Sequence, residues 1–317
     1  MDRLSILCGR FPVALIEHAA VPEMADIADY PPGRRLGPRA YGRNAGSTPG
    51  GPMDQLPTTD PGRSVQRLDD LAGARTLAWG DLSDFFNPFL IHFVEEAFGG
   101  GGEVWVTQVD STVDGLLIYN RVERLGSIFT RDRRVAEVLF GLKEHLALFS
   151  EFPLGTKTEV YHIYRTVGAG TSDTHRFRHR IRMARASDHE AIIRMMREMY
   201  GRIDTSWLHA APRGPEKCLV VDVGDEIAGA GWVSVVNGHG RLHSLSVRPR
   251  FRRLGIGTDL WHARMRWAHR AGALEVISEI SEYNLASQAI ATAGGMERVG
   301  RIFLSFRPEG APVPTSG

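Results

Sequence analysis

A basic, glycine-containing loop in the second half of the chain has the residue types and spacing that most directly indicate chemistry. The apolar, partly alternating run from Leu242 to Val247 predicts a strand, and a helical pattern begins after Gly255 and Gly257. Glycines let backbone N–H groups approach an anion, and a helix N-terminus adds unpaired donors and a positive dipole end. Arg252 and Arg253 add two full charges. This pattern predicts a cradle for a pyrophosphate.

Several protein classes use glycine-rich phosphate loops, and the spacing separates them. A dinucleotide-binding loop needs a third glycine, but Leu260 stands at that position, and a P-loop needs a lysine that does not follow Gly257. The form Arg-x-x-Gly-x-Gly, directly after a strand that ends Val-x-Pro, resembles the coenzyme A loop of the GNAT N-acetyltransferases. The plainer alternative is a basic loop that caps an ordinary helix.

The resemblance implies a mode of binding for acetyl-CoA as the acyl donor. In the family, the backbone of the strand before the loop holds the pantetheine and polarises the thioester carbonyl. Carried over, this role falls to Leu245, Ser246 and Val247. The pyrophosphate contacts fall to the loop and helix start, namely Arg252, Arg253, Gly255, Ile256, Gly257 and Thr258.

A second family motif is only partly present. Asn284 and Ser287 match its first two positions, and Asn284 is expected to lie at the cofactor. The family's tyrosine, which often gives a proton to the departing thiolate, is replaced by Ala291. This departure puts the identity of the general acid in doubt.

His243 and Glu279 are the best candidates for a general base. His243 precedes Leu245 by two residues and is expected on the same strand face, and an ordinary histidine pKa of about 6.5 suits the task. Glu279 is expected on the neighbouring strand, where the family's cleft opens. The structural alternatives are a half-buried histidine and a solvated strand end. The histidines show no ligand-like spacing, so we expect no metal.

The elements that must position these residues predict a mixed α/β fold. Residues 180–308 show the order of strands and helices of a GNAT acetyltransferase domain, and residues 71–166 repeat part of it. In the first half we expect a helix from residue 131 to 149. Residues 167–179 read as a linker. The breaker-rich segments 1–70 and 309–317 are expected to be disordered.

The expected tandem arrangement is unequal. After Thr130 the first half reads Arg131-Asp132-Arg133-Arg134, without glycine, and Asp132 would repel a pyrophosphate. The first half is therefore predicted to be a degenerate GNAT-like domain that has lost cofactor binding. Its expected roles are to pack against the second half and to wall the substrate cleft.

Composition limits the partners. The 317 residues are 43% hydrophobic and 24% charged, with a net charge of +1, which indicates two globular domains and gives no electrostatic case for nucleic acid. Cys8 and Cys218 form no disulfide framework, which suits the cytoplasm. No apolar run reaches the ~18–20 residues that a membrane span needs. The oligomeric state stays open.

Two function classes remain. The first is an N-acetyltransferase whose second half transfers an acetyl group to a primary amine of a small molecule or peptide. The second is a non-catalytic acyl-CoA-binding sensor or partner-recruiting module. Ala291 favours the second class, whereas His243 and Glu279 favour the first.

Overall fold

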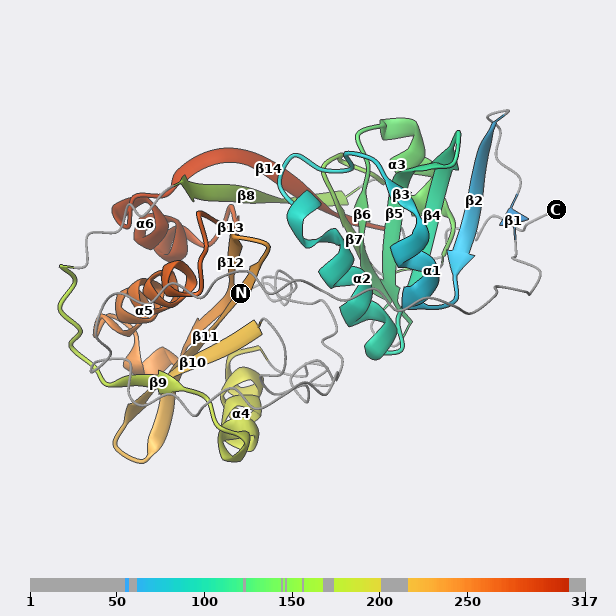
Figure 1. Ribbon diagram of the computed structural model, residues 1–317. Helices are drawn as coiled ribbons and strands as arrows, with labels where there is room; N and C mark the ends of the chain where they lie inside the picture. Colours follow the sequence, from blue (N-terminus) through green and yellow to red (C-terminus); the bar gives the residue numbers. More distant parts are fainter. Residues whose placement is uncertain are drawn as a thin grey trace.

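One mixed sheet of fourteen strands runs through both halves of the chain. The computed structural model describes residues 55–56, 62–121, 124–143, 145, 147–155, 157–167, 174–200 and 216–307. Figure 1 shows a first unit built mainly from the first half, a second unit built mainly from the second half, and two long strands between them.

The first half contains, in chain order, β1 (Gln55–Leu56), β2 (Arg63–Leu68), α1 (Leu71–Thr76), β3 (Ala78–Trp79), a 3-10 turn η3 (Asn87–Phe89), α2 (Leu90–Gly99), β4 (Glu103–Val109), β5 (Thr112–Asn120), β6 (Leu125–Phe129), α3 (Arg133–Gly141), β7 (Ala147–Ser150) and β8 (Lys157–Val167). The second half contains β9 (Ile181–Met183), α4 (His189–Tyr200), β10 (Glu216–Val223), β11 (Glu226–Val236), β12 (His239–Val247), α5 (Ile256–Arg270), β13 (Glu275–Ser281), α6 (Leu285–Ala293) and β14 (Glu297–Phe306).

The two halves repeat one strand arrangement. In the first, β2, β4, β5 and β6 pair antiparallel in that order, and β7 then adds parallel to β6. In the second, β9, β10, β11 and β12 pair antiparallel, and β13 adds parallel to β12. The mixed α/β class and the internal repeat predicted from the sequence are confirmed.

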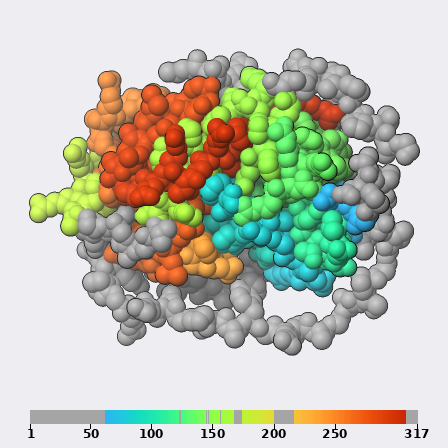
Figure 2. Space-filling view, turned by 90° about the horizontal axis from the view of Figure 1, so that it is seen from above, coloured from blue at the N-terminus to red at the C-terminus, as the bar shows by residue number. Residues whose placement is uncertain are grey.

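The last strand of each half pairs with the other half. β8 lies antiparallel to β13, β14 lies antiparallel to β7, and β8 and β14 pair with each other. Figure 2 shows β14, in red, lying across the boundary between the orange second unit and the green first unit. The sheet is therefore continuous, and each unit is completed by a strand from the other half.

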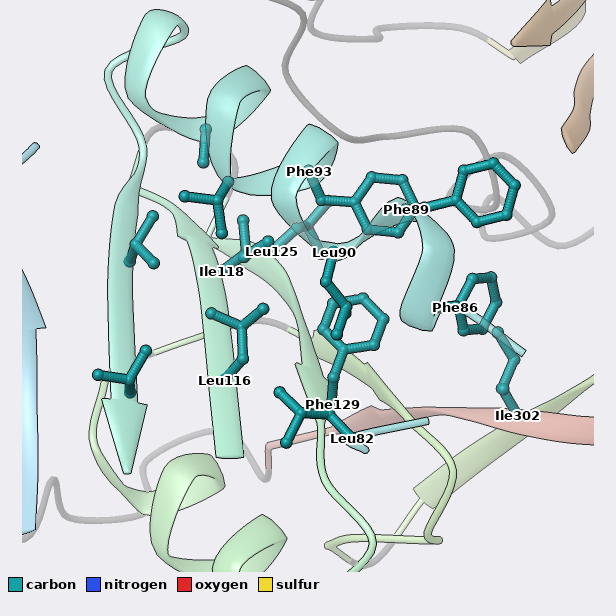
Figure 3. Packing of buried hydrophobic residues seen from close by; sticks show 14 of the residues in the cluster. Leu82, Phe86, Phe89, Leu90, Phe93, Leu116, Ile118, Leu125, Phe129 and Ile302 are labelled. Atoms are coloured by element: carbon teal, nitrogen blue, oxygen red, sulfur yellow. The ribbon is translucent and has the colours of Figure 1, made fainter. Parts of the chain in front are cut away.

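The cores follow this exchange. Phe89, the N-cap residue of α2, and Phe93 of α2 stack with ring centroids 5.9 Å apart and cover the sheet of the first unit. Ile302 of β14 is buried in the same cluster, beside Phe86 (Figure 3). In the second unit, Leu260 and Met265 of α5 are fully buried against strands β10–β13 of the same half. Helix α5 is therefore fixed directly beneath β12.

Two expectations are wrong in part. The disorder expected up to residue 70 does not hold for residues 63–70, because β2 pairs along its length with β4 and buries Val65 and Leu68. β1 pairs with β2 on its other side, so Gln55 and Leu56 are also ordered. A strand near the end of a sheet gains its stability from pairing and a few buried side chains, so its own sequence looks weakly apolar. Residues 1–54 and 308–317, and with them the remaining disorder predictions, lie outside the described residues.

The helix expected from residue 131 to 149 is also too long. Helix α3 ends at Gly141, and residues 147–150 form β7, in which Ala147 and Leu148 are fully buried. A short apolar run fits a buried strand or a helix equally well by periodicity. Pairing with β6 and β14 decides for a strand. Within the described residues, no helix is long and apolar enough to cross a membrane.

Candidate active site

A β-bulge lies in β12 at the residues expected to meet the thioester. Ala230 pairs with Ser246 and Trp232 pairs with His243, so the pairing with β11 shifts by one residue between them. Ser244 takes a positive φ of 52° at this point. A bulge leaves backbone groups outside the regular ladder. Leu245 lies in this bulge, with no register partner on β11.

β12 also loses its other neighbour here. Its parallel pairing with β13 runs from His239 with Glu275 to Leu242 with Ser278. Within this described pair, no register partner continues from His243 to Val247, although β13 stays paired with β8 to Ser281. On the side of β12 away from β11, the segment from Leu245 to Val247 therefore has no β13 residue in register with it.

The loop after β12 ends in the N-terminus of α5. Gly255 is the N-cap residue with a φ of +90°, a conformation that favours glycine, and it offers no side chain to the first-turn N–H groups. Ile256, Gly257 and Thr258 provide those N–H groups. A Cβ at Gly257 would lie 3.3 Å from Ile290 Cδ1, so the position is tight. These features fit a pyrophosphate of acyl-CoA.

Arginines surround this helix end. Arg252 and Arg253 are exposed, and Arg252 Nε donates to the carbonyl of Val247 over 3.2 Å. Arg178, from the segment before β9, was not predicted. A Cβ on Gly255 would lie 3.5 Å from its Cδ and Nη1 atoms. Arg178 is exposed as well, so three guanidinium groups lie around the cradle.

A buried carboxylate fixes the Arg178 segment to α5. Asp259, in the first turn of α5, accepts from the backbone N–H groups of Arg178 and His179 at 3.0 and 3.1 Å. His175 Nε2 and His179 Nδ1 contact it at 2.8 Å each. Burial raises the pKa of Asp259, but these hydrogen bonds together lower it by more, so its pKa lies below the ordinary value. The segment is thus tied to the cradle by an anion.

His243 is buried and paired with a carboxylate that sequence analysis did not identify. Its Nε2 lies 2.6 Å from Glu216 Oε1, on β10, and its Nδ1 lies 3.2 Å from Ser244 Oγ. Burial lowers the pKa of His243, Glu216 opposes this and the nearby Arg241 adds to it, and the net shift is downward. Burial raises the pKa of Glu216, but His243, His92 and Arg241 together lower it by more, so its pKa lies below the ordinary value. The pair is therefore a neutral imidazole on an ionised carboxylate.

Glu279 lies on the same side of the sheet and is also held by a partner. Its Oε1 accepts from Arg241 Nε at 2.7 Å, and both side chains are buried. Among the described residues, Glu279 Oε2 is buried without a hydrogen-bond partner. His243 and Arg241 are two residues apart on β12, so their side chains share a face. The structure brings both predicted bases to one face of the sheet.

The first unit reaches this charged cluster through α2. His92 Nε2 lies 2.9 Å from Glu96 Oε1, and both side chains are buried. Burial raises the pKa of Glu96, and the nearby Glu216 carboxylate adds to that rise against the opposing effect of His92. Arg241 lies over the ring of Phe93, 5.4 Å from its centroid. Side chains of α2 in the first unit therefore lie next to the buried charged residues of β10 and β12.

Arg264 of α5 supports the bulge from below. Its Nη1 donates to the carbonyl oxygens of Trp232 and His243, both at 3.2 Å. A Cβ on Gly231 would lie 2.9 Å from Arg264 Nε, so only glycine leaves room for it. Burial lowers the pKa of this guanidinium. Arg264 thus connects α5 to both strands that form the bulge.

The residues of the second family motif, Asn284 and Ala291, cap and pack helix α6. Asn284 is the N-cap of α6, and its Oδ1 accepts from the N–H of Ser287 at 3.2 Å. Ala291 is fully buried between α5 and α6. Its methyl group lies in the core, so this position supplies no proton donor. Among the described residues, no group of His, Cys, Asp and Glu side chains is arranged to hold a metal ion.

Comparisons with known proteins agree with this geometry. Residues 183–294 match the model of the acetyltransferase (GNAT) family. A search of curated proteins found no match. Among solved structures, a GCN5-related N-acetyltransferase from Sphaerobacter thermophilus is 15% identical with a TM-score of 0.50, over 68% of this chain and 84% of that one. This likeness shows the fold.

Two further structures are similar in extent. An acetyltransferase from the GNAT family of Colwellia psychrerythraea is 11% identical with a TM-score of 0.49, over 77% of this chain and 99% of that one. A tandem GNAT protein from the clavulanic acid biosynthesis pathway is 13% identical with a TM-score of 0.46, over 75% and 93%.

Proposed function

We propose that the second unit, whose residues 183–294 match the GNAT acetyltransferase family model, transfers an acetyl group from acetyl-CoA to a primary amine. The observation that carries this proposal is the bulge in β12, directly followed by the open N-terminus of α5. One feature presents a backbone N–H to a carbonyl oxygen, and the other presents several N–H groups to a phosphate. Together they match the two ends of an acyl-CoA.

The phosphate end is assigned to the cradle. Gly255, Ile256, Gly257 and Thr258 contribute backbone N–H groups, and Arg252, Arg253 and Arg178 contribute positive charge. A helix N-terminus favours an anion through its dipole and its unpaired donors. Asp259 holds Arg178 in place rather than binding the ligand.

The acceptor end is assigned to the buried charged cluster. The neutral imidazole of His243, oriented by Glu216, accepts the proton that the amine loses, and Glu279 is the alternative base. The excess of carboxylates over guanidinium groups favours a cationic amine. Cys218 is excluded as a nucleophile, because burial raises the pKa of its thiol. The cysteine content supports a cytoplasmic reaction.

Release of free thiol from acetyl-CoA in the presence of a primary amine tests this function. We expect thiol release that depends on the amine and an acetylated product of matching mass. Gly257→Asp should abolish both by preventing acetyl-CoA binding.

A second candidate is a non-catalytic acyl-CoA-binding module, and the buried Ala291 favours it because the family's usual proton donor is missing there. Acetyl-CoA binding by calorimetry without thiol release for any amine would select this alternative.

A further inference from the structure

Ser244 lies between the buried histidine and the accessible part of the site. Its side chain is half-buried, whereas His243 is 5% exposed. Adjacent residues of a regular strand point to opposite faces. The positive φ of Ser244 breaks that alternation and brings its Oγ within 3.2 Å of His243 Nδ1. Ser244 is therefore the more exposed residue of this pair.

The tautomer of His243 makes this contact chemically useful. An ionised Glu216 can only accept a hydrogen bond, so the 2.6 Å contact requires a hydrogen on Nε2 of His243. In a neutral imidazole, the lone pair then lies on Nδ1. Ser244 Oγ–H donates to that lone pair. Glu216, His243 and Ser244 thus form a chain of carboxylate, imidazole and hydroxyl.

These three hydrogen-bonded residues lie where the proposed reaction requires a proton donor that the second family motif does not supply. Acetyl transfer needs a group that removes a proton from the amine and a group that gives one to the thiolate. The residue expected as the acid is Ala291, which is buried in the core. Ser244 precedes Leu245, whose N–H is expected to bind the thioester carbonyl. The Ser244 hydroxyl therefore lies one residue before the expected carbonyl-binding N–H and in contact with the candidate base.

We propose that Ser244 and His243 act as a proton relay that moves the proton of the amine to the departing sulfur, a role that rests on the proposed acetyl transfer. After the bound ammonium has released one proton to solvent, the neutral amine nitrogen forms a bond to the carbonyl carbon. Its second proton passes to Ser244 Oγ while the Ser244 proton passes to His243 Nδ1. The carbon–sulfur bond then breaks with its electron pair on sulfur. The His243 proton returns through Ser244 to that sulfur, giving amide and free thiol with the enzyme unchanged.

The decisive variant is Ser244→Gly in the full-length protein. Glycine adopts a φ of +52° without strain, so this change removes the hydroxyl while leaving the bulge intact. We expect turnover to fall by about 10²-fold or more, with an unchanged acetyl-CoA dissociation constant and an unchanged or higher melting temperature. The assay measures thiol release from acetyl-CoA with 1,4-diaminobutane, glucosamine or L-alanine amide.

Ser111→Gly is a matched control. Ser111 has a φ of +65° in the turn between β4 and β5, so its replacement relieves the same kind of backbone strain in the first unit. We expect its turnover to equal that of the wild type. Because a relay acts as one unit, the double variant Ser244→Gly with His243→Gln should lose no more turnover than His243→Gln alone.

The outcomes separate the relay from the proposed function. Full turnover by Ser244→Gly overturns the relay but leaves acetyl transfer standing. The same conclusion follows if the loss of turnover in the double variant equals the product of the losses in the two single variants. A parallel loss of acetyl-CoA affinity would show that Ser244 shapes the cofactor site instead. If the wild type releases no thiol with any of the three amines, both proposals fall.

Discussion

Ile302→Ala tests whether the exchanged strand joins the two units into one folding unit. Ile302 belongs to β14 by sequence but is buried in the core of the first unit, where it lies beside Phe86 (Figure 3). If the exchange is energetically important, this change in the second half should destabilise the first unit.

The expected magnitude follows from burial. Ile302 is 6% exposed, and replacing a buried isoleucine by alanine removes apolar contacts and leaves a cavity. Such a change costs about 2–5 kcal/mol of unfolding free energy. For a chain of this size, each kcal/mol lowers the melting temperature by about 2–4 °C, so we expect a decrease of about 4–20 °C. Ile280→Ala, on β13 in the second unit's core with 7% exposure, is the matched control.

Hydrogen exchange read by mass spectrometry is the appropriate assay, because it reports separately on peptides from each unit. We expect both variants to increase exchange in peptides of β5 and of α5 to a similar extent. If Ile302→Ala accelerates exchange only around β14, or if melting resolves into two transitions that shift independently, the units fold separately and the reasoning is wrong.

Three further predictions follow from the site and the fold. Gly257→Asp places a negative charge and a Cβ 3.3 Å from Ile290 in the cradle, so calorimetry should show at least about tenfold weaker acetyl-CoA binding; unchanged affinity would refute the cradle. A chain that begins at Leu71 lacks β2 and should melt several degrees below one that begins at Met53, since burial of its valine and leucine contributes about 1.5–3 kcal/mol each. Glu216→Gln removes a carboxylate that raises the pKa of His243, so the acidic limb of the pH–rate profile should move to lower pH. A shift of that limb to higher pH would contradict the assignment of His243 as the base.

The cofactor end of the site was predictable because its signal is local. Gly255 and Gly257 lie two residues apart, and their spacing from Val247 fixes a strand, a loop and a helix start in one short stretch. Backbone conformation at such glycines depends little on distant contacts. The expected positions of the loop, helix α5 and strand β12 could therefore be read from residues that are neighbours in sequence.

The acceptor end depends on contacts between distant segments. Glu216 meets His243 across 27 positions of sequence, and Arg264 meets the bulge across 32 and 21 positions. Nothing in the residues around Ser244 marks the bulge, because a polar residue in an alternating strand fits a regular ladder equally well. The exchange of β8 and β14 was not predicted either, since an exchanged strand has the same apolar pattern as one that stays in its own half.

The crossed strands also bear on how such a chain could arise and change. Two identical subunits related by a two-fold axis and swapping their last strands would have this arrangement, and a linker between them would give a single polypeptide. Once joined, the two copies are free to diverge, because mutations in one are no longer repeated in the other. A copy could then lose its phosphate loop, as we expect for the first half from the sequence around Asp132, and still be retained because its neighbour needs the strand it contributes.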